Sequence, residues 1–168
     1  MGPARRLPEM ALAAAAAVIL MGKPRQTLWN VSNSVSENVS LELPMLTRAY
    51  FRAGRAIFRI VPAPRALHRF RLDTKRFRYT LELFAPCYGP GLEKRLSRLR
   101  KIQDYLGEIN DCVATRDLIG RRSAKASSFL ARRTAAKAGA ARKFWEEVFD
   151  ADGQERWWTD YLARFARK

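Results

Sequence analysis

The fold is decided by residues 67–84, which read LHRFRLDTKRFRYTLELF. Wound as an α-helix at about 100° per residue, this stretch separates into two opposite faces. The apolar face carries Phe70, Phe77, Leu81 and Phe84. The cationic face, which includes the only histidine of the chain, carries His68, Arg71, Lys75, Arg78 and, beside them, Tyr79. A helix that gathers like charges on one side favours an anionic partner there.

The flanking sequence predicts two more helices with the same division. In residues 45–61 four arginines recur at steps of four, three and four, opposite an apolar side: Arg48, Arg52, Arg55 and Arg59. Pro62 and Pro64 end that helix, because proline cannot continue the hydrogen-bond ladder. Residues 92–106 place a leucine-rich stripe opposite a basic row that contains Arg98 and Lys101.

The remainder of the chain also reads as helix. Gly107 predicts a break before a further helical stretch at 108–119, and residues 121–149 predict a fourth segment. After a turn at 152–153, the aromatic and apolar residues at 157–165 predict a closing helix. No stretch alternates apolar and polar residues as a half-buried strand does. The sequence therefore predicts an all-α fold, an antiparallel helical bundle with short connections.

The N-terminal part differs from the rest. Residues 1–44 are interpreted as an apolar segment followed by a polar linker at 29–44 that need not be ordered, and residues 45–168 as the helical domain. The apolar run at 10–21 is too short to span a bilayer. Export as a signal peptide, a membrane anchor and a short buried helix are the alternative interpretations of this run.

The charge of the chain indicates which partners it can bind, and its cysteine content indicates its compartment. The chain has 32 Lys and Arg against 16 Asp and Glu, a net charge of +16, which favours nucleic acid, an anionic membrane surface or a phosphate polymer. Two scattered cysteines and one histidine make a disulfide framework or a zinc site unfavourable, so we expect a reducing, cytoplasmic location and no metal or cofactor.

A single basic helix face is usually just solvated, but three such faces in consecutive helices predict that the rows converge on one surface or groove. Such a surface suffices to hold linear polyphosphate, which has no bases to read. His68 is either an anion contact or a half-buried helix cap, and Tyr79 either binds phosphate or packs. Glu82 is expected to fix Arg78, and Asn110 to have a structural role. No phosphate loop or nucleophile pair is present in the sequence, so we expect no enzyme.

Two linked motifs resemble a known family. Residues 67–84, quoted above, followed by LSRLRKIQDYLGEINDCVATRDL at 96–118, resemble the second repeat of the CHAD domain, the conserved histidine α-helical domain. The resemblance covers about residues 64–119. It implies a helical bundle that binds inorganic polyphosphate through a basic surface, and in many members an association with polyphosphate granules. It also implies site residues: His68, Arg71, Lys75 and Arg78, with Arg69 and Arg76 as flanking candidates.

The chain departs from the family in one respect. A full CHAD domain resembles two helical bundles in tandem, whereas this sequence holds one His-x-x-Arg helix and resembles a single C-terminal repeat. We therefore predict a homodimer in which two copies rebuild the paired arrangement. The alternative function is non-specific nucleic-acid binding. If the chain binds polyphosphate, we expect nucleic acid to act only as a non-specific competitor for the same surface. Attachment to a membrane is the least favoured function.

Overall fold

The computed structural model describes residues 29–59, 62–119 and 122–164, and within these ranges it is helical with no strand. The α-helices in chain order are α2 (Val35–Phe58), α3 (Pro64–Leu83), α4 (Glu93–Ile119), α5 (Ala124–Phe144) and α6 (Gln154–Arg164). The predicted all-α fold is confirmed. The apolar run at 10–21 lies outside the described residues.

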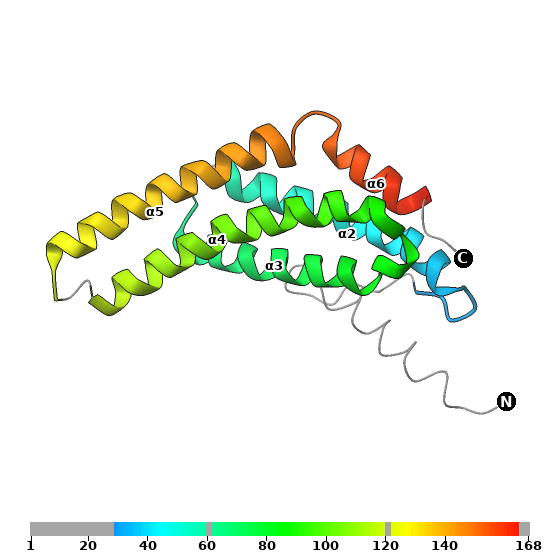
Figure 1. The fold of residues 1–168 in the computed structure, drawn as a ribbon, viewed down its shortest axis with the longest axis horizontal. Coiled ribbons are helices and arrows are strands. Elements are labelled where there is room, and N and C mark those ends of the chain that lie inside the picture. Colours follow the sequence, from blue (N-terminus) through cyan, green and yellow to red (C-terminus); the bar gives the residue numbers. More distant parts are fainter. Residues whose placement is uncertain (1–28, 60–61, 120–121, 165–168) are drawn as a thin grey trace, which may run out of the picture.

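The helices form an antiparallel bundle of four columns (Figure 1). Helices α2, α3 and α4 each fill one column, and α5 and α6 share the fourth. α3 packs between α2 and α4, while α5 packs on α4 and α6 packs on α2. Between α5 and α6 the chain widens into one π-helical turn, Trp145–Phe149. Two short 3₁₀ helices, Ala85–Cys87 and Gly89–Leu92, turn the chain from α3 into α4.

The core is dominated by aromatic rings from α2, α3 and the column of α5 and α6, and α4 adds mainly aliphatic side chains. Tyr50 of α2 stacks on Phe77 of α3 with ring centroids 4.8 Å apart, and its hydroxyl lies 2.9 Å from the Thr74 hydroxyl. Trp145 stacks on Phe149 at 4.7 Å. Such pairs contribute about 0.5–1.5 kcal/mol each beyond the area that they bury. The α3 side of this core consists of the apolar face that the sequence predicted.

The first helix begins ten residues earlier than predicted, so the interpretation of residues 29–44 as a linker is wrong over its C-terminal part. Ser34 caps α2 by accepting from the Glu37 backbone N–H at 3.2 Å, and Glu37 accepts from the Ser34 N–H at 2.7 Å. Asn38 is fully buried and exchanges hydrogen bonds with the Asn30 backbone at 2.8 and 2.9 Å. These polar side chains therefore cap and anchor the start of a helix and do not belong to a linker.

The break predicted at Gly107 is also wrong, because α4 runs without interruption from Glu93 to Ile119. Glycine weakens a helix by about 1 kcal/mol relative to alanine and does not end it by itself. Packing of α4 against both α3 and α5 outweighs that cost. The predicted helices at 92–106 and 108–119 are thus one element.

Arg95 fastens α6 to α4. Its guanidinium lies between the rings of Trp157 and Tyr161, 3.5 and 3.8 Å from their centroids, and donates to the Trp157 carbonyl at 2.5 Å. Burial without a carboxylate partner lowers the pKa of Arg95 to about 10. This cation is part of the core and not of a surface site.

Candidate functional site

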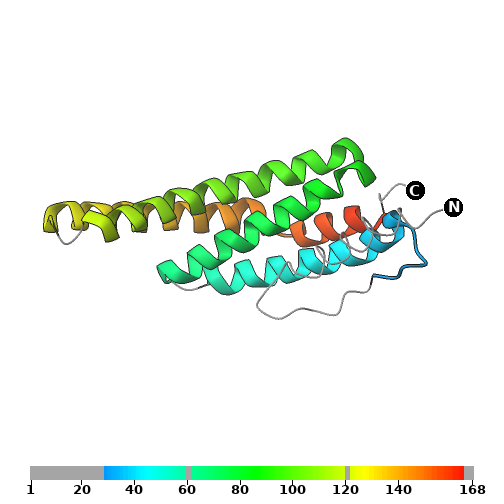
Figure 2. The same cartoon turned by 90° about the horizontal axis from the view of Figure 1, so that it is seen from below.

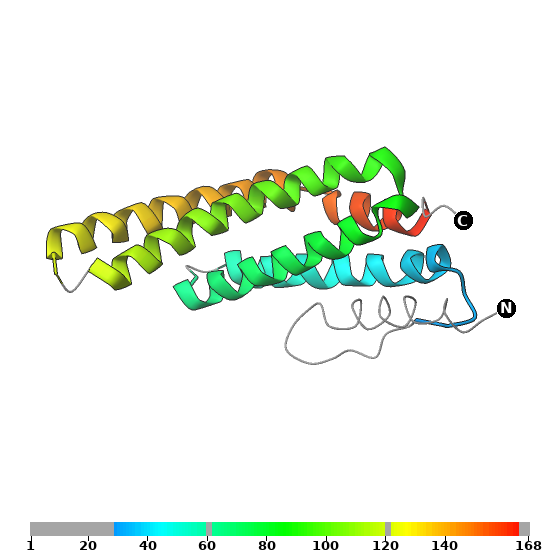
Figure 3. The ribbon, with the colours of Figure 1, turned by 60° about the horizontal axis from the view of Figure 1, so that its bottom comes forward.

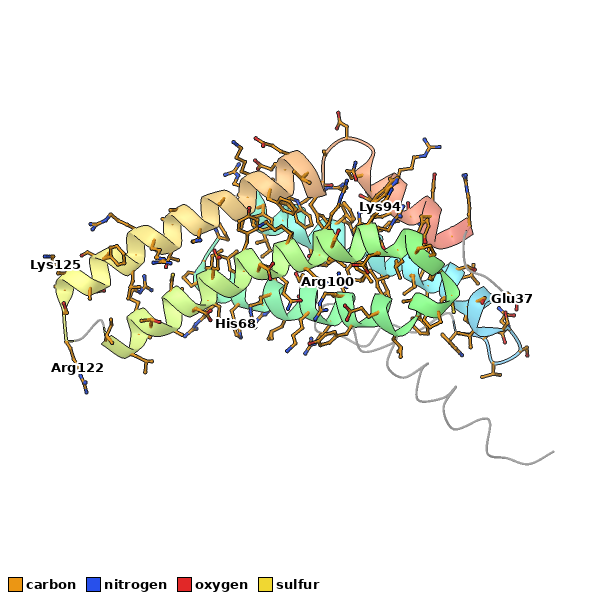
Figure 4. The ribbon with its side chains drawn as sticks, in the orientation of Figure 1. Glu37, His68, Lys94, Arg100, Arg122 and Lys125 are labelled. Atoms are coloured by element: carbon orange, nitrogen blue, oxygen red, sulfur yellow. The ribbon has the colours of Figure 1, made fainter. Side chains whose placement is uncertain are left out.

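The cationic face of α3 lies along the line where α3 and α4 run side by side. We call the set His68, Arg71, Lys75, Arg78 and, from α4, Arg100 the α3–α4 basic face. Figure 4 shows His68 and Arg100 on this side of the bundle. His68 and Arg78 both bond to α4 side chains, which fixes the rotation of α3 relative to α4.

His68 is held by Asn110 of α4, with 2.7 Å between imidazole Nδ1 and amide Oδ1. Because an amide oxygen only accepts hydrogen bonds, Nδ1 carries the proton in this arrangement. The second ring nitrogen, Nε2, is then directed away from Asn110. The imidazole is exposed, so Nε2 is the atom that can meet a ligand.

Arg78 is the most constrained cation of the face. Its Nε donates to Gln103 Oε1 at 2.9 Å, and its Nη1 donates to Glu82 Oε1 at 2.5 Å. The guanidinium also lies over the Tyr79 ring, 4.5 Å from the centroid. The expected pairing of Glu82 with Arg78 is confirmed. A guanidinium held in this way loses little rotamer entropy when it meets an anion.

Two further α3 cations complete the row. Lys75 lies 5.6 Å from the centroid of the Tyr79 ring. Arg71 is half-buried, and its Nε finds no hydrogen-bond acceptor among the described residues. Tyr79 itself is 48% exposed, so it sits between two cations with much of its ring in solvent.

Arg100 extends the face onto α4, and the sequence reasoning did not select it. It bonds to Glu93 and lies 3.6 Å from Glu82, and its bond to Glu93 raises the pKa of its guanidinium. The signal was present: Arg100, Gln103, Gly107 and Asn110 recur at three- and four-residue steps along one side of α4. This polar stripe is the side that α4 turns towards α3.

Arg69 and Arg76 occupy the outer, exposed side of α3. Arg76 lies 3.7 Å from Asp73, and Arg69 lines a hollow at the N-terminal end of the helix. They lie beside the α3–α4 basic face, and their role as flanking site residues stays a prediction.

The arginines of α2 do not join that face. Arg55 donates to Asp150 at 2.6 and 2.7 Å and lies 2.6 Å from Glu155, both at the start of the α6 region. Arg48 lines an open hollow together with Arg55 and these two carboxylates. Arg52 is exposed on α2, and Arg59 is exposed at the C-cap that follows the helix. The α2 row is thus partly neutralised by carboxylates on another side of the bundle.

Arg98 and Lys101 of α4 also face away from α3. Arg98 bonds to Gln154 and lies over the Trp157 ring at 4.8 Å, towards α6. Lys101 lies beside Tyr105, whose ring contacts Phe144 of α5. The predicted convergence of all three basic rows on one surface is therefore wrong. Among the described residues, the α3 row is joined by Arg100 of α4 and not by the arginines of α2.

Fold and site together define an all-α bundle with a cationic face between two antiparallel helices. The family model described as CHAD domain matches residues 9–120, well over half of the chain. The chain belongs to the CHAD domain family. The match extends upstream of the motif region to include α2, and it ends before α5.

No curated protein and no solved structure matches the chain. Across residues 29–59, 62–119 and 122–164, no helix has the length and apolar character needed to cross a membrane. Within the same residues no three His, Cys, Asp or Glu side chains gather in a way that could hold a metal ion.

Proposed function

We propose that the chain binds inorganic polyphosphate, without catalysis, through the α3–α4 basic face. Binding of polyphosphate is a general property of CHAD domains. The observation that carries the proposal is the way these cations are held. His68 is positioned by the neutral amide of Asn110, and Arg78 is positioned partly by that of Gln103. Amides orient these side chains without adding negative charge, whereas Glu82 and Glu93 partly neutralise Arg78 and Arg100. Arg71 and Lys75 form no ion pair with the described residues, so they keep the middle of the row positive.

Geometry supports a linear ligand. His68 and Arg78 are ten residues apart, which spans about 15 Å of helix axis. The cations between them follow at three- and four-residue steps along the same side. A straight line of positive charges of this length matches a flexible phosphate chain, which carries about one negative charge per phosphate unit. Such a chain has no bases, so the charges alone are sufficient to recognise it.

The test is a competition titration at about 150 mM salt. The protein is first bound to fluorescent long-chain polyphosphate, which is then displaced by unlabelled polyphosphate, DNA or RNA of equal phosphate concentration. The variant Arg71→Ala/Lys75→Ala/Arg78→Ala is compared with Arg48→Ala/Arg52→Ala/Arg59→Ala, which removes the same charge from α2. Thermal unfolding confirms that each variant folds. We expect the α3 variant to lose at least tenfold in affinity and the α2 variant only a few-fold.

Equal losses in the two triple variants would contradict a discrete site, because they would indicate a diffuse cationic surface. Release of orthophosphate from polyphosphate by the wild type would contradict the non-catalytic part of the proposal.

We also propose a cytoplasmic location with polyphosphate granules as the place of action, testable by fluorescence imaging of a tagged chain.

Non-specific nucleic-acid binding is the second candidate, and one observation favours it. Tyr79 is half-exposed between Lys75 and Arg78, and an aromatic ring beside cations can stack a base of a single strand. In the same titration, competition by single-stranded DNA as strong as that by polyphosphate, lost in Tyr79→Ala, would support this function instead.

A further inference from the structure

The helical hairpin formed by α4 and α5 reaches past the other columns. Figures 2 and 3 show its tip extending well beyond the N-terminal end of α3. Among the 21 residues of α5 only Ala141 is buried. The side of α5 opposite α4 is open to solvent, and we call it the α5 outer face. Its residues recur at three- and four-residue steps and are all exposed: Lys125, Phe129, Arg132, Arg133, Ala136, Ala140 and Lys143.

The charge of α5 has one sign only. The helix contains no Asp or Glu, and its basic residues are Lys125, Arg132, Arg133, Lys137, Arg142 and Lys143. The last three of these pair with glutamates of α4 or of the π-helical turn. Lys125, Arg132 and Arg133 form no ion pair with the described residues. Since like charges on one helix repel each other, these three cations favour an anionic partner on the α5 outer face.

The α5 outer face and the α3–α4 basic face lie on different sides of the bundle. On α4, Asn110 bonds to α3, whereas Glu108 pairs with Lys137 of α5. Two positions along a helix are about 200° apart around its axis, so α3 and α5 pack on different sides of α4. Figure 1 shows α4 running between them, and Figure 4 shows Lys125 and His68 on these separate sides. A phosphate chain lying along one face therefore leaves the other face uncovered.

We propose that the α5 outer face binds a second chain of polyphosphate through Lys125, Arg132 and Arg133, so that one copy of the protein crosslinks two phosphate chains. This inference rests on the proposed function of the α3–α4 basic face. Once that face holds one chain of a dense polymer, neighbouring chains are present at a high effective concentration, so a weak second contact suffices.

The α5 outer face should be the weaker of the two surfaces. Its cations are exposed and have no amide neighbours that position them, in contrast to His68 and Arg78. Binding there depends on charge alone and should be lost at a lower salt concentration than binding to the α3–α4 basic face. The face carries one aromatic ring, Phe129, and otherwise alanines between its cations, so it offers no series of rings on which successive bases could stack.

The test is a bridging assay at about 150 mM salt. The protein is bound to beads that carry immobilised polyphosphate, unbound protein is washed away, and capture of fluorescent short-chain polyphosphate by the beads is measured. The variant Lys125→Ala/Arg132→Ala/Arg133→Ala removes the three unpaired cations, and alanine keeps the helix. The α2 triple variant of the competition titration, which removes the same charge, is the matched control.

We expect the wild type and the α2 variant to bind the beads and to capture the fluorescent chain. The α5 variant should bind the beads within about threefold of the wild type and lose capture by at least about tenfold. Circular dichroism checks that each variant folds. Sedimentation velocity checks that the α5 variant keeps the oligomeric state of the wild type, because a dimer with two α3–α4 basic faces would also bridge two chains.

Two results overturn the inference and leave the proposed function intact. One is a wild type that binds the beads and captures no second chain. The other is an α5 variant that captures as the wild type does, or that loses capture only together with a change of oligomeric state. A wild type that does not bind the beads overturns the proposed function, and this inference with it. Capture of single-stranded DNA in place of polyphosphate, lost in Phe129→Ala, would assign the α5 outer face to nucleic acid instead.

Discussion

The imidazole Nδ1 of His68 on α3 lies 2.7 Å from the amide oxygen of Asn110 on α4. The two residues are 42 positions apart in sequence, so this bond joins the two helices that form the basic face. It fixes the proton on Nδ1 and leaves Nε2 towards the ligand side. Asn110 is therefore a positioning residue for His68.

A double-mutant cycle tests that relationship. We expect His68→Ala and Asn110→Ala each to weaken polyphosphate binding by about two- to tenfold, and the double variant to lose no more than the stronger single variant. Non-additivity follows because Asn110 acts only through the imidazole. Fluorescence titration with labelled polyphosphate measures it. Fully additive losses would show that Asn110 contributes independently.

Removing one negative charge should strengthen the site. Glu82 lies against both Arg78 and Arg100, so Glu82→Gln leaves these cations less neutralised while keeping an acceptor for Arg78. We expect affinity for polyphosphate to rise by a few-fold and the salt dependence to steepen.

Glu146→Gln provides the matched control for this change. Glu146 accepts from Arg142 at 2.8 Å in the same i,i+4 spacing, but Arg142 lies on α5 and Glu146 in the π-helical turn that follows, away from the face. It should change affinity little. An equal gain in both variants would mean that net charge alone sets the binding.

Stability should respond in opposite directions to alanine at two helical glycines. A Cβ at Gly54 would lie 2.1 Å from the Trp145 ring, whereas a Cβ at Gly107 would meet nothing within 4 Å. Gly54→Ala should therefore destabilise by about 1–3 kcal/mol or more through overpacking. Gly107→Ala should stabilise by about 0.5–1 kcal/mol. Urea unfolding followed by circular dichroism measures both. Similar gains in the two variants would mean that Trp145 does not pack on Gly54.

The buried carboxyl of Asp73 gives a pH dependence of stability. Burial raises the pKa of Asp73 above its usual value, more than the nearby Arg76 and Arg69 lower it. An acid whose pKa is higher in the folded state favours folding when protonated. Its ionised form therefore costs stability at neutral pH, and this cost is relieved as the pH falls through the folded-state pKa.

Asp73→Asn should raise the unfolding midpoint at pH 7 and reduce the change in midpoint between pH 7 and the acid range. Thermal unfolding across that range measures it. A lower midpoint at pH 7 would show that the ion pair with Arg76, at 3.7 Å, outweighs the burial.

Much of α3 could be predicted because its signals are local. Pro64 sets the start of α3, and the periodicity of Phe70 and Phe77 sets the face that it buries. The start of α2 was missed although Ser34 and Glu37 have the spacing of a capping box. The polar composition around them suggested a linker, and burial of a polar side chain such as Asn38 cannot be read from composition.

The arrangement of the basic rows could not be predicted, because it depends on how each helix is rotated in the bundle. Gly54 allows the Trp145 ring to approach α2 closely. The next residue of α2, Arg55, pairs with Asp150, which follows the π-helical turn that contains Trp145. This long-range packing turns the α2 arginines towards α6. A helical pattern gives the face of each helix but not the neighbour that the face meets.

The capped start of α2 sets where the folding unit can be shortened. Val39 and Leu43 are fully buried, and Trp29 packs its ring 6.3 Å from Phe84 at the far end of α3. A chain trimmed to begin at Met45 would lose all three and uncover the aromatic core next to them. Such a fragment would keep every cation of the α3–α4 basic face and still fail as a reagent, because it would aggregate before it could bind.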